Sequence, residues 1–210
     1  MITKTPKQLY IAVEGLDGSG KTTAVNFIEQ LIRYKGYNCL TIREPGGTAL
    51  SEKIRTIIKT LDELLYRPSD SVLSMLVNAA RLDNLEQLID KASEDFILTD
   101  RCYLSTFVYQ NRTNLNPTLC RLGTRDYNRV PDIVFILDVD YRTSYNRIVG
   151  RGLKTDSLEE VSEAVFDARR AVYQSFLKEQ NGKTRFIHIN GAQDRELVEE
   201  DICNVLEQYL

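Results

Sequence analysis

The sequence is poor in the residues that bind transition metals. It has a single histidine, His188, and four cysteines that lie far apart, at Cys39, Cys102, Cys120 and Cys203. The absence of a CxxC pair or any other metal-ligand spacing argues against a zinc site and against a disulfide framework. The cysteines are therefore expected to be reduced thiols, as in a cytoplasmic protein.

The sequence also lacks an excess of positive charge and long apolar runs. Lys and Arg number 27 against 30 Asp and Glu, which gives a formal net charge of -3. This balance offers no general attraction for nucleic acids or acidic membranes, so any phosphate binding must come from a local site. No stretch approaches the roughly 18 apolar residues that a membrane-spanning helix needs, and no basic and apolar leader indicates export. We expect a soluble, intracellular protein.

What the chain does have is a regular alternation of two kinds of segment. Short apolar runs rich in Val, Ile and Phe predict buried strands at 9–13, 39–42, 96–98, 133–137 and 186–189. Helical spacing predicts helices at 22–34, 51–59, 70–91, 105–110, 141–149, 158–179 and 194–210, and the polar segment 111–117 predicts a surface loop. The alternation predicts an α/β fold with a parallel sheet covered on both faces, in one domain spanning 1–210.

A glycine-rich stretch follows the first predicted strand. Residues 15–22, GLDGSGKT, fit the pattern GxxxxGK[ST] between a strand and a helix, which is the context of a phosphate-binding P-loop. Backbone amides there can approach the β-phosphate, Lys21 can reach the β and γ oxygens, and the Thr22 hydroxyl can bind Mg²⁺. The candidate residues for binding ATP with Mg²⁺ are Gly15, Asp17, Gly18, Ser19, Gly20, Lys21, Thr22 and Thr23.

The strand predicted at 96–98 leads to Asp100 and Arg101. Asp100 is placed to hold Mg²⁺ through water. Hydrolytic P-loop motors commonly carry a water-activating Glu at the next position, whereas Arg101 is a cation suited to a second anion. The pair predicts phosphoryl transfer to an anionic acceptor, the alternative being a plain surface ion pair.

Candidate acceptor residues follow the second predicted strand and recur downstream. Residues 43–48, REPGGT, begin with Arg43 and Glu44 where loops at the carboxyl ends of parallel strands line a ligand crevice. Arg55 and Arg81 lie in predicted helices, and on spacing alone each is at least as well explained as a solvated charge on a helix face.

Taken together, these motifs resemble the bacterial-type thymidylate kinases. The resemblance covers nearly the whole chain, through VEGLDGSGKTT, REPGGT with EKIR behind it, AAR, TDR, LSTFVYQ, PDIVFILDV and the RxxxR spacing of Arg147 and Arg151. It implies an enzyme that phosphorylates dTMP to dTDP with ATP and Mg²⁺. It also implies a P-loop NTPase fold with a five-stranded parallel sheet in three α/β/α layers, commonly as a homodimer.

The resemblance also implies a role for each acceptor residue. Arg101 and Arg43 would hold the acceptor phosphate and Glu44 would lie near its sugar. Further substrate contacts are implied for Asp17, for Arg55 and Arg81 at the phosphate or base, for Thr106 and Gln110 at the base edge, and for Tyr109 at the 2′ position, where it would select deoxyribose.

A lid at about residues 147–158 would supply a further catalytic arginine. In this family that arginine comes from the P-loop or from the lid, and the P-loop position here is Ser19, which leaves Arg147 and Arg151. Four residues apart, they are predicted to share one helix face. Their alternative role is as cations that stabilise the end of a helix. The predicted catalytic set is Lys21, Arg101, Arg147 and Arg151.

Three positions depart from the pattern of the family. Val77 stands where a Phe usually stacks on the base, Cys102 where a Tyr or His often follows Asp-Arg, and Ser157 where an Arg commonly follows Asp156. These departures leave phosphoryl transfer intact and keep a second interpretation open, in which the acceptor is another deoxynucleotide such as a 5-substituted dUMP. A nucleotide-dependent binding module is a third interpretation, although neither a guanine-reading NKxD motif nor a Glu after Asp100 supports it.

Overall fold

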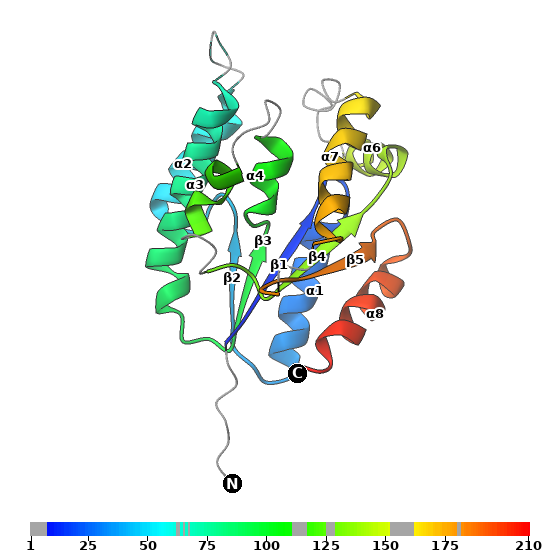
Figure 1. Cartoon of the computed structure of the whole chain (residues 1–210). Coiled ribbons are helices and arrows are strands. Elements are labelled where there is room, and N and C mark those ends of the chain that lie inside the picture. The colour runs from blue at the N-terminus through cyan, green and yellow to red at the C-terminus, as the bar shows by residue number, and fades with distance from the viewer. Residues whose placement is uncertain are drawn as a thin grey trace.

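A sheet of five parallel strands runs through the centre of the computed structural model (Figure 1). The structure describes residues 8–61, 64, 66, 68–110, 117–124, 129–151, 162–179 and 182–210. The strands are β1 (Leu9–Gly15), β2 (Cys39–Arg43), β3 (Phe96–Asp100), β4 (Ile133–Asp138) and β5 (Arg185–Asn190). They lie in the order β2-β3-β1-β4-β5. The predicted α/β class and five-stranded parallel sheet are confirmed.

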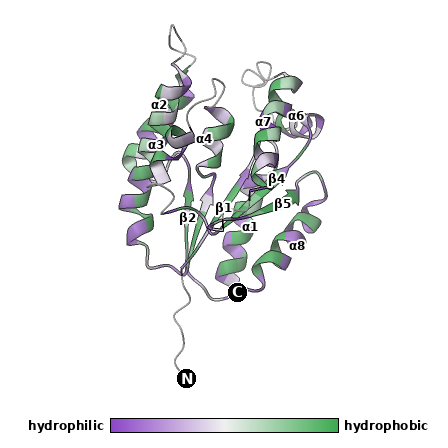
Figure 2. Cartoon of the chain, viewed as in Figure 1, coloured by the Kyte–Doolittle hydropathy of each residue, from purple (hydrophilic) through white to green (hydrophobic). Residues whose placement is uncertain are grey.

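Helices cover both faces of the sheet, which gives the three layers of a P-loop NTPase fold. They are α1 (Lys21–Tyr34), α2 (Ala49–Lys59), α3 (Asp70–Gln87), α4 (Leu104–Tyr109), α5 (Pro117–Arg121), α6 (Tyr141–Val149), α7 (Glu163–Phe176) and α8 (Arg195–Leu206), with 3₁₀ turns η2 (Ile89–Lys91) and η3 (Leu122–Thr124). Side chains of α1 and α8 form one core cluster with the sheet, and those of α4 and α7 form a second. In a third cluster, Leu85 of α3 packs against Ile42 and Ile97 of the sheet. Figure 2 shows the strands between the helices as largely apolar.

Successive side chains of β1 point to opposite faces of the sheet and so pack against different helices. Ile11 and Val13 are buried in the core with α1 and α8, whereas Ala12 is buried in the core with α4 and α7. Glu14 has the same parity as Ala12, so this carboxylate enters the α4 and α7 layer and not solvent.

The strand register brings the ends of three strands to one level. Val13 of β1 and Arg43 of β2 both pair with Asp100, the last residue of β3. The chain leaves β1 toward β2 on one side, and β4 lies on the other side, so β1 stands where the strand order reverses. Ligands of open parallel sheets bind at such a point, beyond the carboxyl ends of the strands.

Several predicted boundaries were wrong. The helix predicted at 70–91 ends at Gln87, because Leu88 leaves helical geometry and the η2 turn places Ile89 in the core. The helix predicted at 158–179 is described from Glu163, where the Ser162 side chain accepts from the amide of Val165, and its predicted residues 158–161 lie outside the described residues. The last helix ends at Leu206 instead of residue 210.

Helix α5, beginning at Pro117, was not predicted, and residues 111–116 of the predicted loop lie outside the described residues. Within the described ranges, no helix has the length and apolar character that crossing a membrane requires.

Candidate active site

The P-loop connects β1 to α1 through glycines in left-handed backbone conformations. Gly18 has φ 77° and Gly20, the N-cap of α1, has φ 97°, a region that side chains rarely adopt. No side chain caps α1 and its first turn has no acidic residue. The free amides at this helix end therefore suit a phosphate group.

Helix α6 supports the P-loop from outside. Ser144 Oγ donates to the carbonyl of Asp17 at 2.6 Å, and a Cβ on Gly18 would lie 2.7 Å from the carbonyl oxygen of Ser144. Arg147 Nη1 donates to the carbonyls of Gly18 at 3.4 Å and Gly191 at 2.7 Å. The loop is thereby held by backbone and side-chain contacts before any ligand is present.

Lys21 is the buried cation of the P-loop. Its side chain is 8% exposed, and Nζ donates to the carbonyl of Leu16 at 2.8 Å and lies 3.8 Å from Asp17 Oδ1. Burial, with the nearby charge of Arg101, lowers the pKa of Lys21 to about 8. An anion bound at the loop would restore the charged form.

Asp100 ends β3 beside the P-loop. Its Oδ1 is buried and accepts no hydrogen bond within the described part of the chain. Thr22, at the start of α1, is exposed. A buried carboxylate oxygen without a donor, together with an available hydroxyl, fits the oxygen chemistry that Mg²⁺ prefers. No group of three or more His, Cys, Asp or Glu side chains that could hold a metal ion occurs among the residues described.

Arg101 follows Asp100 with φ 77°, in the left-handed region that a non-glycine residue occupies at a cost. Its guanidinium donates from Nη2 to Asp17 Oδ1 at 2.7 Å and from Nη1 to Ser105 Oγ at 3.2 Å. The guanidinium carbon lies 5.1 Å from the centre of the Tyr109 ring. Strained backbone of this kind concentrates at functional sites.

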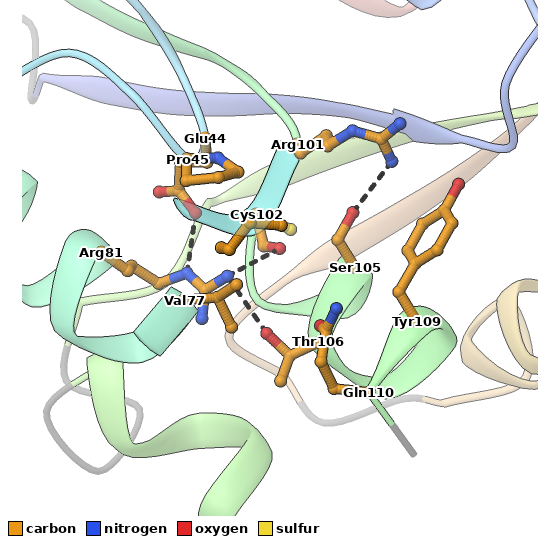
Figure 3. A pocket seen from close by; sticks show the side chains of 11 residues that line it. Glu44, Pro45, Val77, Arg81, Arg101, Cys102, Ser105, Thr106, Tyr109 and Gln110 are labelled. Carbon is orange, nitrogen blue, oxygen red and sulfur yellow. Dashed lines mark hydrogen bonds and ion pairs between the residues drawn. The ribbon is translucent and has the colours of Figure 1, made fainter. Parts of the chain in front are cut away.

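Arg101 lines a cavity of about 200 Å³, which we call the acceptor pocket. Figure 3 shows its labelled side chains gathered from Glu44 and Pro45 after β2, from α3 and from the 101–110 segment. The lining residues are Glu44, Pro45, Ile58, Val77, Arg81, Arg101, Cys102, Ser105, Thr106, Tyr109 and Gln110. The structure thus brings seven of the predicted substrate-binding residues around one cavity: Glu44, Val77, Arg81, Arg101, Thr106, Tyr109 and Gln110.

An ion pair forms one wall of the acceptor pocket. Arg81 Nε lies 2.7 Å from Glu44 Oε2, and its Nη2 donates to the Cys102 carbonyl and to Thr106 Oγ1 (Figure 3). Burial raises the pKa of Glu44, and Arg81 opposes that rise. The second carboxylate oxygen, Oε1, is buried and accepts no hydrogen bond from any described residue. The wall of the pocket therefore holds a free hydrogen-bond acceptor, Glu44 Oε1, beside an arginine whose charge is balanced by the same carboxylate.

The remaining predicted acceptor arginines are Arg43, the last residue of β2, and Arg55 of α2. Arg43 is 48% exposed and pairs with Glu52 at 3.1 Å. Arg55 Nη1 donates to the carbonyl of Pro45 at 3.0 Å, so this side chain supports the loop that carries Glu44. Burial lowers the pKa of Arg55.

A second cavity lies on the other side of the P-loop, and we call it the donor pocket. Its volume is about 260 Å³, and its lining includes Ser19, Gly20 and Thr23 from the P-loop region, with Arg147 and Arg151. The prediction that the two arginines share a helix face was wrong, because α6 ends at Val149 and Arg151 lies in the following turn. They still line the same pocket. Residues 152–158 of the predicted lid, with Asp156 and Ser157, lie outside the described residues.

The sequence analysis missed two groups close to this site. Glu14 accepts hydrogen bonds from α4 and α7, and the signal was a charged residue at the end of an otherwise apolar strand. Arg169 of α7 lies with its guanidinium carbon 5.0 Å from the centre of the Tyr109 ring. No motif in the sequence around Arg169 indicated this contact.

A P-loop flanked by two pockets, with arginines on both sides and no water-activating glutamate after Asp100, defines the class of P-loop kinases that act on small phosphorylated acceptors. Sequence comparisons identify the family within this class. The family model for thymidylate kinase matches residues 13–202, and the chain belongs to the thymidylate kinase family.

Curated relatives match along nearly their whole length. The chain is 34% identical over 207 residues to a thymidylate kinase of Teredinibacter turnerae, covering 96% of this chain and 98% of the relative. A thymidylate kinase of Thermosipho africanus is 33% identical, with coverages of 96% and 99%. One from Legionella pneumophila is 33% identical, with coverages of 95% and 94%.

Proposed function

We propose that the protein transfers the γ-phosphoryl group of ATP to dTMP and releases ADP and dTDP. The observation that carries this proposal is the contact between Arg101 and Asp17, which places the acceptor pocket directly against the P-loop. Relatives of matching length that are named thymidylate kinase favour dTMP over a modified deoxynucleotide as the acceptor.

The donor side uses the P-loop from Gly15 to Thr23 and the pocket beyond it. Amides at the start of α1 would bind the β-phosphate of ATP and Lys21 would reach the β and γ oxygens. Thr22 and Asp100 would hold Mg²⁺, which neutralises charge on the phosphates when bound. The donor pocket lies next to Ser19, Gly20 and Thr23, as the remainder of ATP requires.

On the acceptor side, we assign the phosphate of dTMP to Arg101, with Arg43 and Asp17 near it. The free Oε1 of Glu44 would accept a hydrogen bond from the 3′-hydroxyl of the deoxyribose, because a buried acceptor without a partner is costly and the ligand would supply the missing donor. Arg81 and Arg55 shape the wall and the loop around it. Thr106, Gln110 and Val77 would contact the base, and Tyr109 would crowd a 2′-hydroxyl.

Catalysis would come from positioning and from the neutralisation of charge. Two anionic phosphates must meet in line, and such transfers need little covalent participation by the protein. Lys21 and Arg101 would lie on the two sides of that meeting point. We propose that Arg147 or Arg151, with the lid at about 147–158, adds positive charge as the transition state forms.

We further propose a single-domain, cytoplasmic enzyme that works as a homodimer. The free state of all four cysteines supports a reducing compartment. Exposed apolar side chains on the neighbouring helices α2 and α3 support pairing of two copies: Leu50 and Ile57 are 51% and 50% exposed, and Val72 and Met75 are 47% and 54% exposed. A Met75→Glu variant that sediments as the wild type does would contradict this surface assignment.

The function is tested by measuring ADP release from ATP with each of several acceptors and with none. We expect rapid release with dTMP, little with thymidine, which lacks the phosphate that Arg101 binds, and little with the ribonucleotide of the same base. Faster turnover with 5-hydroxymethyl-dUMP than with dTMP would show that the modified nucleotide, and not dTMP, is the preferred acceptor. Equal release without any acceptor would contradict the kinase assignment itself.

A further inference from the structure

Glu14 is a buried carboxylate to which the proposed reaction gives no role. Its relative exposure is 0%, and it forms no ion pair within the described part of the chain. Oε1 accepts from the amides of Cys102 at 2.8 Å and Ser105 at 3.1 Å, while Oε2 accepts from Ser105 Oγ at 2.9 Å and Tyr173 Oη at 2.7 Å. A buried carboxylate is tolerated only when its oxygens are satisfied, and these four donors supply that.

These hydrogen bonds reach Arg101 by two routes. Along the backbone, the amide of Cys102 is the one that follows Arg101, so Glu14 anchors the turn that holds Arg101 at φ 77°. Through the side chain, Ser105 Oγ donates to Glu14 and accepts from Arg101 Nη1 at 3.2 Å (Figure 3). Because the hydroxyl proton is committed to Glu14, the oxygen lone pairs of Ser105 are left facing the guanidinium.

Asp17 also contacts Arg101, at 2.7 Å, but from a carboxylate that water reaches. The Asp17 side chain is 64% exposed, and ion pairs that water reaches fix a side chain poorly. Glu14 is fully buried and Ser105 is half-buried, so water reaches the hydrogen bond between them less than it reaches the Asp17 carboxylate. The Ser105 contact fixes Nη1 while Asp17 fixes Nη2, so the two together set the direction of the guanidinium before a ligand arrives.

We propose that Glu14 is a positioning residue that acts through Ser105 and the 101–105 turn to aim Arg101 at the phosphate end of the acceptor pocket. The inference rests on the proposed function, because it takes the phosphate of a nucleoside monophosphate as the ligand of Arg101. The Glu14 carboxylate itself touches neither substrate.

The test compares the affinities for dTMP and thymidine, without ATP, in a double-mutant cycle. The ratio of the two dissociation constants isolates the phosphate contact, and the cycle shows whether Ser105 acts through Arg101. Ser105→Ala should lower the preference for dTMP about threefold to tenfold, the range expected for loss of one typical hydrogen bond. In an Arg101→Ala background the same substitution should leave the ratio unchanged. Glu14→Gln should behave in the same way.

Thr184→Val is the matched control for loss of a buried hydroxyl. Thr184 Oγ1 donates to the Pro131 carbonyl at 2.7 Å, beside the start of β5 at the far end of the sheet. This variant should lose stability and keep the dTMP preference of the wild type. An effect of Ser105→Ala that is absent, or equal in both backgrounds, would overturn the inference and leave the proposed function standing. An Arg101→Ala variant that keeps the full dTMP preference would overturn the phosphate assignment as well.

Discussion

Arg101 and Asp17 are 84 residues apart in the chain, yet Nη2 of one lies 2.7 Å from Oδ1 of the other. The contact follows from the parallel pairing of β1 with β3, which brings the P-loop and the end of β3 together. It also joins the acceptor pocket to the phosphate-binding loop. Two phosphates bound on either side would therefore lie within one site, which is the arrangement that direct transfer requires.

The first prediction concerns the proton of Lys21. Its pKa of about 8 in the free protein lies below its ordinary value, so Lys21 loses its charge as the pH rises past 8. We expect kcat/KM for ATP to fall above that pH, whereas kcat stays level to higher pH because bound phosphates favour the charged lysine. Lys21→Ala should lower kcat by about 10²- to 10³-fold.

The same shift has a consequence for stability. The unfolded chain keeps the Lys21 proton to higher pH than the folded chain, so the free energy of unfolding should rise with pH from about 8 to about 10.5 on account of this group. Lys21→Met should remove that dependence and raise the melting temperature of the ligand-free protein. A melting temperature lowered by this substitution would contradict the burial cost assigned to Lys21.

The second prediction concerns the backbone of Arg101. At φ 77° the backbone of a residue with a Cβ atom is strained, whereas glycine adopts this conformation without strain. The free energy of unfolding of Arg101→Gly should therefore exceed that of Arg101→Ala by about 1 kcal/mol, although both variants lose the guanidinium. Denaturant unfolding measures the difference. Equal stability of the two variants would show that the turn relaxes when the arginine is removed.

The third prediction separates Arg147 from Arg151. Arg147 donates to two backbone carbonyls, so Arg147→Ala should cost about 1–2 kcal/mol of stability, whereas Arg151→Ala should cost little. If either arginine closes over the phosphates, its removal should lower kcat more than it raises the KM for ATP. Unchanged kcat in both single variants and the double variant would leave them as cations at the end of a helix.

The fourth prediction concerns Val77 in the acceptor pocket. A ring stacked on a base contributes about 1–3 kcal/mol in nucleic-acid complexes, and Val offers a smaller apolar contact. We expect modest discrimination among dTMP, dUMP and 5-hydroxymethyl-dUMP, and Val77→Phe should sharpen it. The measurement is kcat/KM for the three acceptors, and a parent already selective and unaffected by the change would show that Val77 only packs.

The sequence predicted the residues of the candidate site better than the contacts that hold those residues in place. The P-loop, Asp100 and Arg101 could be predicted because their residue types follow strands at fixed spacing, and parallel strands meet at one edge. Glu44 and Arg81 were both predicted to lie at the acceptor site, but their ion pair was not, because a pairing 37 residues apart depends on how α3 packs beside β2.

The role of Glu14 shows the same limit. Its partners come from α4 and α7, so the contacts exist only once both helices cover the same face of β1. Helix ends were also poorly predicted. The break at Leu88 follows from burying Ile89, a tertiary effect that the local pattern of 70–91 does not contain.

The central claim is that the phosphoryl group passes from ATP to a nucleotide and not to water. The most direct measurement follows the label of [γ-³²P]ATP in the presence and absence of dTMP, with Arg101→Ala beside the wild type. We expect that label appears in dTDP in step with ADP formation, and that the Arg101 variant shows a raised KM for dTMP and a lowered kcat. Release of the label as inorganic phosphate at the same rate with and without dTMP would contradict the claim.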